Sequence, residues 1–190
     1  AINVELGSLI KTSGTTSISN SSDYGVDIRQ GGIADLNGLT LNVSTTGINA
    51  VNNSTVKITD SSLTSSSGRV IYSRGGVALE IDNTTITGNS SKGAVALNDG
   101  SNLQISGSTI SGGKSGIKAV YNSTVRLQGG NTITGNAQHG IHLLNSTLHQ
   151  YSDAGTTTIS SNTGSEIRAE RSFLKLEGVT ITGTGGSTEV

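Results

Sequence analysis

The stretch that decides the fold is "NSTVRLQGGNTITGN", residues 122–136, because close versions of it occur twice more in the chain. "NSTVKITDSSLTSS" begins at Asn53 and "NSTLHQYSDAGTTTIS" begins at Asn145. Each version alternates apolar and polar residues, passes through a polar turn and then alternates again, which is typical of short strands with one buried face. Such self-similarity predicts a repeat architecture in which each unit stacks on the next.

The composition favours a core built without aromatic packing. The 190 residues include 27 glycines, four tyrosines and one phenylalanine, and they include no proline, methionine, tryptophan or cysteine. Hydrophobic residues make up 32% and charged residues 13%, so Ser, Thr, Asn and Gly fill most of the remainder. In random order this mixture favours disorder, and a folded state therefore depends on regular patterning of aliphatic residues.

Charge and hydropathy exclude several classes of protein. Twelve Lys and Arg against 13 Asp and Glu give a net charge of -1, so we expect no nucleic-acid partner. The longest apolar runs are only three or four residues, whereas a membrane-spanning helix needs about 20, so we expect no membrane insertion of this segment. The absence of cysteine excludes a disulfide framework and a thiolate metal site.

Glycines recur at intervals of roughly 23 residues, and we assign each as the start of one unit. They are glycines 25, 47, 68, 93, 116, 140 and 164. In the unit that begins at Gly116, the apolar residues form three short alternating runs over residues 117–119, 125–127 and 132–134. A period of two predicts strands, and three runs predict three strands in each unit.

Three strands in a unit of this length leave no room for a helix, and a single unit cannot bury its inward face. Parallel stacking at about 4.8 Å per coil solves this, so we expect an all-β solenoid of about eight coils with three short strands each. The residues expected to stack inward are Ile48, Val56, Val95, Leu103, Ile117, Val125, Ile133 and Ile141. Residues 1–190 form one domain, and the final "GGSTEV", which lacks a capping helix, favours a fragment of a longer protein.

Asparagines recur at two places in the unit. Asn53, Asn122 and Asn145 fall between the first and second strands, where Asn tolerates left-handed backbone angles. A second series follows the third strand, at Asn20, Asn89, Asn136 and Asn162. Many of the asparagines also read as Asn-x-Ser/Thr glycosylation acceptors, but their repetition in the register of the unit favours turn chemistry.

The repeated signatures "TTITGNSSKGAVAL", "STISGGKSGIKAV" and "NTITGNAQHGIHLL" resemble the coils of right-handed parallel β-helices. That fold is shared by pectate-lyase-like polysaccharide enzymes, phage tailspikes and the passenger domains of bacterial autotransporters. The Ser/Thr/Asn/Gly-rich, cysteine-free composition and the short turns look most like an autotransporter passenger. The resemblance implies a virulence-type domain that is secreted or exposed on the bacterial outer membrane.

Enzyme chemistry in this fold would require carboxylates close together on one sheet face. Inverting hydrolysis, for example, needs two carboxylates about 6.5 to 9.5 Å apart. The first strand's outward column is expected to contain Asp27, Asn49, Ala96, Lys118, His142 and Arg168. The second strand's column is expected to contain Asp35, Lys57, Glu80, Gln104, Arg126, His149 and Lys175. No acid faces another acid in either column, so we expect no catalytic residues.

Metal sites and cofactors are also not expected. His139, His142 and His149 are close in sequence, but their positions on separate strands and turns argue against convergence on Zn²⁺. The sequence has neither a carboxylate cluster nor the glycine-aspartate nonapeptide that binds Ca²⁺ in β-rolls. Long loops, which build substrate clefts, are missing too, and the longest unit is the one that begins at Gly68.

A rigid rod with exposed sheets suits binding. Basic residues gather on the first two strands of the C-terminal units and on the turn between them, and they are Lys118, Arg126, His142, His149, Arg168, Arg171 and Lys175. We expect these side chains to form one surface that binds an acidic glycan or protein on a host cell, as an adhesin or receptor ligand. Two alternatives stay open: a polysaccharide-active enzyme or tailspike fragment, and a passive stalk.

Overall fold

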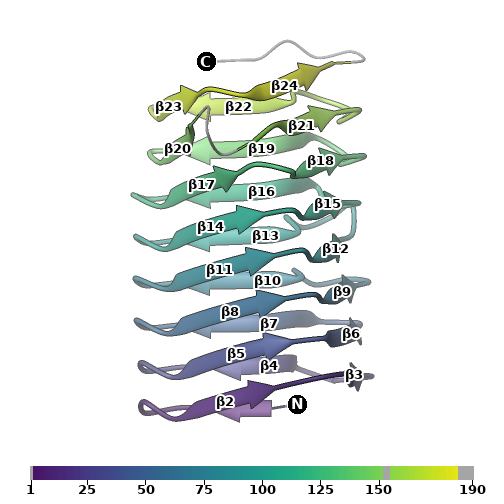
Figure 1. Ribbon diagram of the computed structural model, residues 1–190, viewed down its shortest axis with the longest axis vertical. Helices are drawn as coiled ribbons and strands as arrows, with labels where there is room; N and C mark the ends of the chain where they lie inside the picture. Colours follow the sequence, from purple (N-terminus) through teal and green to yellow (C-terminus); the bar gives the residue numbers. More distant parts are fainter. Residues whose placement is uncertain (1, 152–154, 184–190) are drawn as a thin grey trace.

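The computed structural model describes residues 2–151 and 155–183, and it shows a stack of strands wound into a solenoid (Figure 1). Sheet A contains β1 (Ile2–Val4), β4 (Tyr24–Ile28), β7 (Thr46–Val51), β10 (Ile71–Arg74), β13 (Val95–Asn98), β16 (Ser115–Val120), β19 (His139–Leu144) and β22 (Ile167–Glu170). Sheet B contains β2 (Leu9–Thr12), β5 (Ile33–Asn37), β8 (Thr55–Thr59), β11 (Ala78–Asp82), β14 (Asn102–Ser106), β17 (Thr124–Gln128), β20 (Thr147–Gln150) and β23 (Phe173–Leu176). Sheet C contains β3 (Thr16–Ser19), β6 (Leu39–Val43), β9 (Ser62–Ser65), β12 (Thr85–Thr87), β15 (Thr109–Ser111), β18 (Thr132–Thr134), β21 (Thr157–Ser160) and β24 (Val179–Thr182).

Every strand pairs in parallel with its equivalent in the next coil, which gives three parallel sheets of eight strands. The predicted all-β solenoid of eight coils with three strands each is therefore confirmed. No helix long and apolar enough to cross a membrane occurs in the described residues. The closing "GGSTEV" lies outside the described residues.

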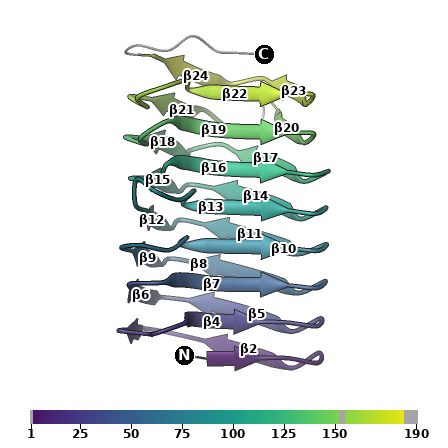
Figure 2. The same ribbon diagram turned by 180° about the vertical axis from the view of Figure 1, so that it is seen from behind.

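Sheets A and B lie face to face, and sheet C closes one side of the coil. Sheet B is nearer the viewer in Figure 1 and sheet A is nearer in Figure 2, which is the view from behind. A tight turn connects each strand of sheet A to the next strand of sheet B. The outward side chains of sheets A and B therefore point to opposite sides of the molecule.

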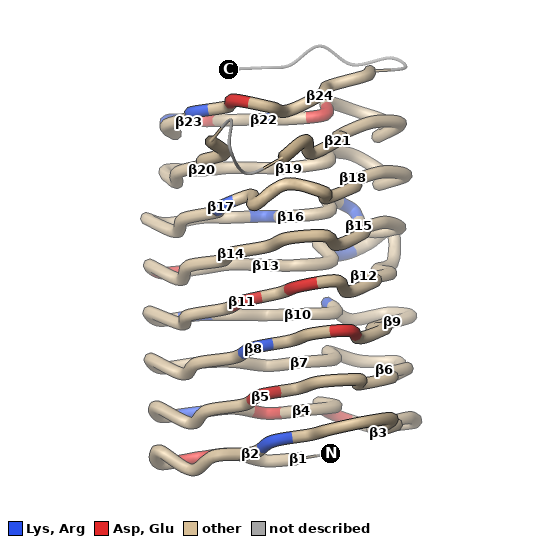
Figure 3. Tube along the Cα trace, viewed as in Figure 1, with Lys and Arg blue, Asp and Glu red and all other residues tan. Residues whose placement is uncertain are grey.

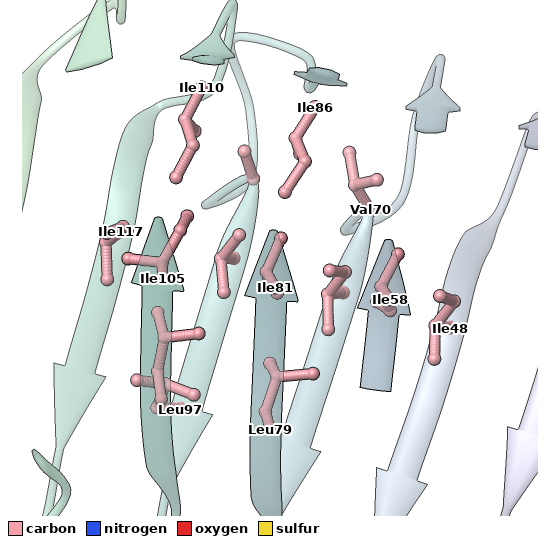
Figure 4. Close-up of a cluster of buried hydrophobic side chains, with 14 of the residues drawn as sticks. Ile48, Ile58, Val70, Leu79, Ile81, Ile86, Leu97, Ile105, Ile110 and Ile117 are labelled. Carbon is pink, nitrogen blue, oxygen red and sulfur yellow. The ribbon is translucent and has the colours of Figure 1, made fainter. Parts of the chain in front are cut away.

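The interior is a column of aliphatic side chains. Figure 4 shows side chains from all three sheets pointing into this shared interior, among them Ile48, Leu79 and Ile110. All eight residues predicted to point inward are at most 1% exposed. Those predictions are confirmed, and the reason is the strand pairing, which places each aliphatic residue directly over its equivalent. Val125, for example, pairs with Leu103 on one side and Leu148 on the other.

The two asparagine series have different roles. Asn53, Asn122 and Asn145 adopt φ angles of 59°, 60° and 47°, so the predicted left-handed turn is confirmed. In the second series, Asn136 and Asn162 are buried, and the side-chain amide of Asn136 donates to Asn162 Oδ1 at 2.8 Å. This second series is a buried hydrogen-bond ladder only in the C-terminal coils, because its first member near the other end of the rod is exposed.

The assignment of a glycine to the start of every coil is wrong for three coils. The equivalent position in each coil is the one directly before the first inward aliphatic residue of sheet A. In register it holds Gly25, Gly47, Val70, Ala94, Gly116, Gly140 and Glu166. At Gly116 a Cβ atom would lie 2.8 Å from a backbone oxygen of the next coil, so glycine is required there. β10 and β13 begin one residue after this position, and there the chain accommodates the side chains of Val70 and Ala94.

The coil that begins near Gly68 is not the longest. The paired residues Ile71 and Val95, which measure that coil, are 24 residues apart, whereas Ile141 and Ile167 are 26 residues apart. The longest interval thus contains residues 152–154, which lie outside the described part of the chain.

Candidate functional site

The structure places the predicted basic residues in two columns with the predicted register. On sheet A, Lys118 pairs with His142 and His142 pairs with Arg168. On sheet B, Arg126 pairs with His149 and His149 pairs with Lys175. Arg171 lies in the turn between β22 and β23.

The two columns do not form one surface. Sheets A and B turn their outer faces in opposite directions (Figures 1 and 2), so Lys118 and Arg126 point to opposite sides of the rod. The prediction of a single basic patch is therefore wrong in its geometry. Alternation along a strand correctly identified the outward positions, but it contains no information about the angle between two sheets. Arg171 lies at the edge where the two faces meet.

The sheet A column is partly neutralised by Glu170. The guanidinium Nε of Arg168 lies 2.9 Å from Glu170 Oε1, and this hydrogen bond holds the pKa of Glu170 below its usual value. His142 Nε2 lies 3.5 Å from the same oxygen, which is long for a hydrogen bond. Partial burial, followed by the nearby charge of Lys118, lowers the pKa of His142, and Glu170 opposes that shift. His142 is thus neutral near pH 7.

Two other acids close in sequence to the basic residues, Glu166 and Glu177, lie in different surroundings. Glu166 is 1% exposed and points into the interior, where Asn162 donates to its carboxylate from its backbone and its side chain. It therefore contributes little to the outer surface. Glu177 lies 3.3 Å from Lys175 on the outside of the last coil.

On sheet B, the basic column is interleaved with aromatic rings. His149 stacks on Tyr151 with 6.0 Å between ring centroids and 7° between ring planes, and it also contacts the ring of Phe173 at 5.8 Å. Lys175 Nζ lies 4.6 Å from the centroid of Tyr151, which is within cation-π range. Tyr151 and Phe173 are 47% and 58% exposed, so both rings are accessible to solvent.

A pocket of about 560 Å³ lies beside this cluster, at the edge between sheets A and B. The residues that line it and that bear on function are Tyr121, Asn122, Asn145, Thr147, Arg171 and Phe173. We call it the edge pocket. Tyr121 is 54% exposed, and Phe173 belongs both to the pocket and to the cluster on sheet B. The pocket and the cluster are therefore one continuous region.

We call this region the aromatic–cationic surface, and it consists of Tyr121, His149, Tyr151, Arg171, Phe173 and Lys175. The structure thus brings together three of the seven predicted residues, His149, Arg171 and Lys175. Arg126 continues the same sheet B column, whereas Lys118, His142 and Arg168 lie on the opposite face. Sequence reasoning missed the three aromatic residues. A usable signal existed, because the chain has only five Phe and Tyr residues and three of them fall between positions 121 and 173.

Charge is distributed unequally along the rod (Figure 3). In the N-terminal coils, basic and acidic residues alternate on sheet B, with Lys11 paired to Asp35 at 3.2 Å and Lys57 paired to Glu80 at 3.0 Å. No Asp or Glu occurs in the sequence between Asp99 and Asp153. Within residues 2–151 and 155–183, no carboxylate lies within 4.0 Å of a charged nitrogen of three C-terminal cations, which are Lys118, Arg126 and Arg171.

A second hollow, of about 440 Å³, lies on sheet B over β8, β11, β14 and β17. Its floor dips at Ala78, the smallest side chain in its column, and Lys57, Glu80 and Arg126 rise beside it. The ion pair between Lys57 and Glu80 neutralises most of this groove, and Arg126 at its end adjoins the aromatic–cationic surface. No aromatic ring lines it, so it offers less to a ligand than the edge pocket.

The described residues contain no group of three His, Cys, Asp or Glu side chains that could hold a metal ion. The rings of His139 and His142 lie 5.2 Å apart on sheet A, whereas His149 lies on the opposite face. Asp60 and Asp82 occupy neighbouring coils, but each carboxylate accepts a hydrogen bond, from Asn83 at 2.6 Å and Ser106 at 2.7 Å. These hydrogen bonds connect neighbouring coils.

Comparison with known proteins gives one family. The family described as right handed beta helix region matches residues 9–188. No curated protein and no solved structure matches the chain. Because the match covers nearly the whole sequence, and because the chain folds as a parallel solenoid with three strands per coil, this protein belongs to the right-handed β-helix family.

Proposed function

We propose that this chain is a non-enzymatic passenger-type domain, secreted or displayed on a bacterial outer membrane, that binds an acidic partner on host cells through the aromatic–cationic surface. The observation that carries the proposal is that the exposed rings of Tyr121 and Phe173 line one pocket with Arg171, a cation that lacks a described carboxylate partner. Unpaired cations and open ring faces are characteristic of binding surfaces, since both gain from a ligand that covers them.

Electrostatics supports an acidic partner. Arg126 and Arg171 are exposed, and the nearest sequence on either side of Arg126 contains no acid over more than twenty residues. Such a local excess of positive charge attracts anions over about one Debye length, roughly 8 Å at physiological salt. Binding through these residues should therefore weaken as salt concentration rises.

The N-terminal coils support a different role within the same rod. Their ion pairs satisfy one another, and their described rings form single contacts, Arg29 with Tyr24 and Arg69 with Tyr72, rather than a cluster of several rings. We infer that these coils act as a spacer that does not contact the partner, as expected for a rigid solenoid. The stalk alternative thus applies to part of the chain.

The test is binding of the purified domain to cultured human epithelial cells, measured by flow cytometry. The variant Arg126→Glu/Arg171→Glu/Lys175→Glu should lose binding at least tenfold, while Lys11→Glu/Lys57→Glu/Arg74→Glu, which has the same net charge, should keep it. Lys118→Glu/Arg168→Glu should also keep it, because those side chains lie on the other face. Circular dichroism must show that all three variants remain folded. Equal loss in the first two variants would mean that net charge alone drives binding, and the proposal would fail.

A further inference from the structure

Two residues of the edge pocket occupy backbone positions that do not suit them. One position in each turn from sheet A to sheet B has a positive φ angle, and in register it holds Leu6, Gln30, Asn52, Gly75, Asp99, Tyr121, Asn145 and Arg171. Glycine, asparagine and aspartate tolerate this conformation. Tyr121 and Arg171 adopt it at φ angles of 56° and 48°, as Leu6 and Gln30 do in the first two coils, although left-handed angles are unusual for bulky residues.

The fold gains little from these two side chains in return. Tyr121 is 54% exposed, Arg171 is also exposed, and no ion pair to Arg171 occurs among the described residues. Asn145, which lies between them in the stack, shows that a small polar residue suffices to make the turn.

The edge pocket has the chemistry of a site for one ring-shaped, hydroxylated and anionic group. Tyr121 and Phe173 offer apolar ring faces, and Asn122, Asn145 and Thr147 add donors and acceptors around them. The guanidinium of Arg171 supplies a planar pair of donors that matches a carboxylate. A volume of about 560 Å³ lies within the range of small-ligand sites, about 300–1,000 Å³.

We propose that the edge pocket is a subsite for one carboxylated sugar residue of a host glycan. The pyranose face packs on the rings of Tyr121 and Phe173, and the carboxylate accepts two hydrogen bonds from Arg171. This inference rests on the proposed function and names its ligand class.

A protein partner fits the pocket less well. The pocket is formed by the turns of three adjacent coils, which span roughly 10 Å along the axis. A stable protein interface buries about 1,200 Å² or more, which is far more than this edge supplies. The ligand is therefore small or is one unit of a chain that extends over sheet B.

The experiment uses Tyr121→Asn and Arg171→Asn in the otherwise unchanged protein, with Tyr72→Asn as a matched control on sheet A of an N-terminal coil. Binding is measured on immobilised sialylated and uronic-acid-containing oligosaccharides, each beside its carboxyl methyl ester, which keeps the ring and removes the charge. We expect the unmodified protein to bind at least one free acid about tenfold or more above its ester. Tyr121→Asn and Arg171→Asn should lose that binding, and Tyr72→Asn should keep it.

Thermal unfolding separates binding from a structural role. Both pocket variants should melt at the same temperature as the unmodified protein or higher, because asparagine relieves the left-handed conformation. A fall of more than about 3 °C in either variant would mean that the side chain stabilises the turn. Binding of an ester as tightly as its acid, or of no carboxylated glycan at all, would overturn the carboxylate assignment.

Cell binding distinguishes this inference from the proposed function. If Tyr121→Asn binds cells normally while Arg126→Glu/Arg171→Glu/Lys175→Glu does not, the subsite is wrong and the proposed function stands. If glycosidase treatment of the cells leaves binding intact and protease treatment abolishes it, the partner is a protein surface and the sugar assignment is wrong. Loss of binding after glycosidase treatment and in both pocket variants supports the inference.

Discussion

The coils between β4 and β12 and the coils between β16 and β24 share one interior but differ outside. In both regions the inward positions hold aliphatic residues that are almost completely buried, such as Val56 and Val125. Outside, the N-terminal coils alternate charges into ion pairs, as at Lys57 and Glu80, whereas the C-terminal coils carry exposed aromatic rings and cations without described carboxylate partners. The interior is therefore constrained by stacking, and the outer positions are free to differ in function.

The shared interior gives the largest expected effect. Val56→Asp and Val125→Asp each place a charge in the aliphatic column, and each should lower the free energy of unfolding by about 3–5 kcal/mol. Arg126→Ala, one residue from Val125 but facing outward, should change it by less than about 1 kcal/mol. Chemical denaturation followed by circular dichroism measures all three. Equal effects at Val125 and Arg126 would show that the faces of the strand are reversed.

The buried asparagine ladder distinguishes the two regions in stability. Asn162 donates to backbone oxygens of Ile133 at 3.2 Å and Ser160 at 3.1 Å, and it also holds the buried carboxylate of Glu166. Asn162→Ala should lower the free energy of unfolding by about 2–3 kcal/mol, because it leaves a buried acceptor unpaired. Adding Glu166→Gly, which copies the glycine at position 140, should recover part of the loss.

Asn20→Gly, at the exposed N-terminal end of the same series, serves as the control and should change the free energy of unfolding by less than about 0.5 kcal/mol. Urea denaturation of the four proteins gives the comparison. An equally large loss at both ends would mean that every member of the series stabilises its coil, and the two regions would not differ in this respect.

Acid should destabilise the sheet A face of the C-terminal coils in two steps. The lowered pKa of His142, caused by burial and by Lys118, means that the unfolded chain binds the proton more readily, so stability falls as pH drops through the ordinary value of 6.5. Glu170 has a lowered pKa because Arg168 bonds to it, so its contribution is present above 4.5 and is lost as pH falls further.

Melting temperatures measured between pH 8 and pH 3 check this order. His142→Gln should flatten the upper step and Glu170→Gln the lower one. A melting temperature of the unmodified protein that rises as the pH falls from 7 to 5.5 contradicts the description of His142.

The smallest expected effect concerns the ion-pair ladder itself. Lys57→Gln should lower the melting temperature slightly at low salt, and the difference should vanish near about 1 M NaCl, where exposed pairs are screened. Arg126→Gln, in the same column but without a described partner, should leave the melting temperature unchanged at every salt concentration. Scanning calorimetry resolves differences of this size, and identical salt dependence in the two variants would remove the electrostatic contrast between the regions.

The sequence was sufficient to predict the fold because the fold depends on a period. Alternation placed Val125 inward and Arg126 outward, and repetition placed each residue over its equivalent, as the pairing of His149 with Lys175 confirms. The angle between sheets is not encoded in that period, so the relation of Lys118 to Arg126 was missed. The inward direction of Glu166 is not encoded in the period either, because it follows from the register of a coil whose first position departs from glycine.

The aromatic residues of the binding surface were missed because each appears singly in the sequence. Tyr121, Tyr151 and Phe173 come from a turn, the end of a strand and the start of another strand. They meet only because coils about 4.8 Å apart bring positions separated by a whole unit together. Interpreting the sequence coil by coil, with outward columns drawn as surfaces, would have revealed the cluster.

Photo-cross-linking on living host cells tests the central claim most directly, namely that ligand contact is confined to the C-terminal end. Phe173 and Leu9 occupy the same outward column of sheet B at opposite ends of the rod and are 58% and 66% exposed. Benzoylphenylalanine replaces either residue, and cells are irradiated with each variant bound. We predict a cross-linked cell-surface product from position 173 and none from position 9. Equal products from both positions, or a product from position 9 alone, would contradict the division of the rod into a spacer and a binding region.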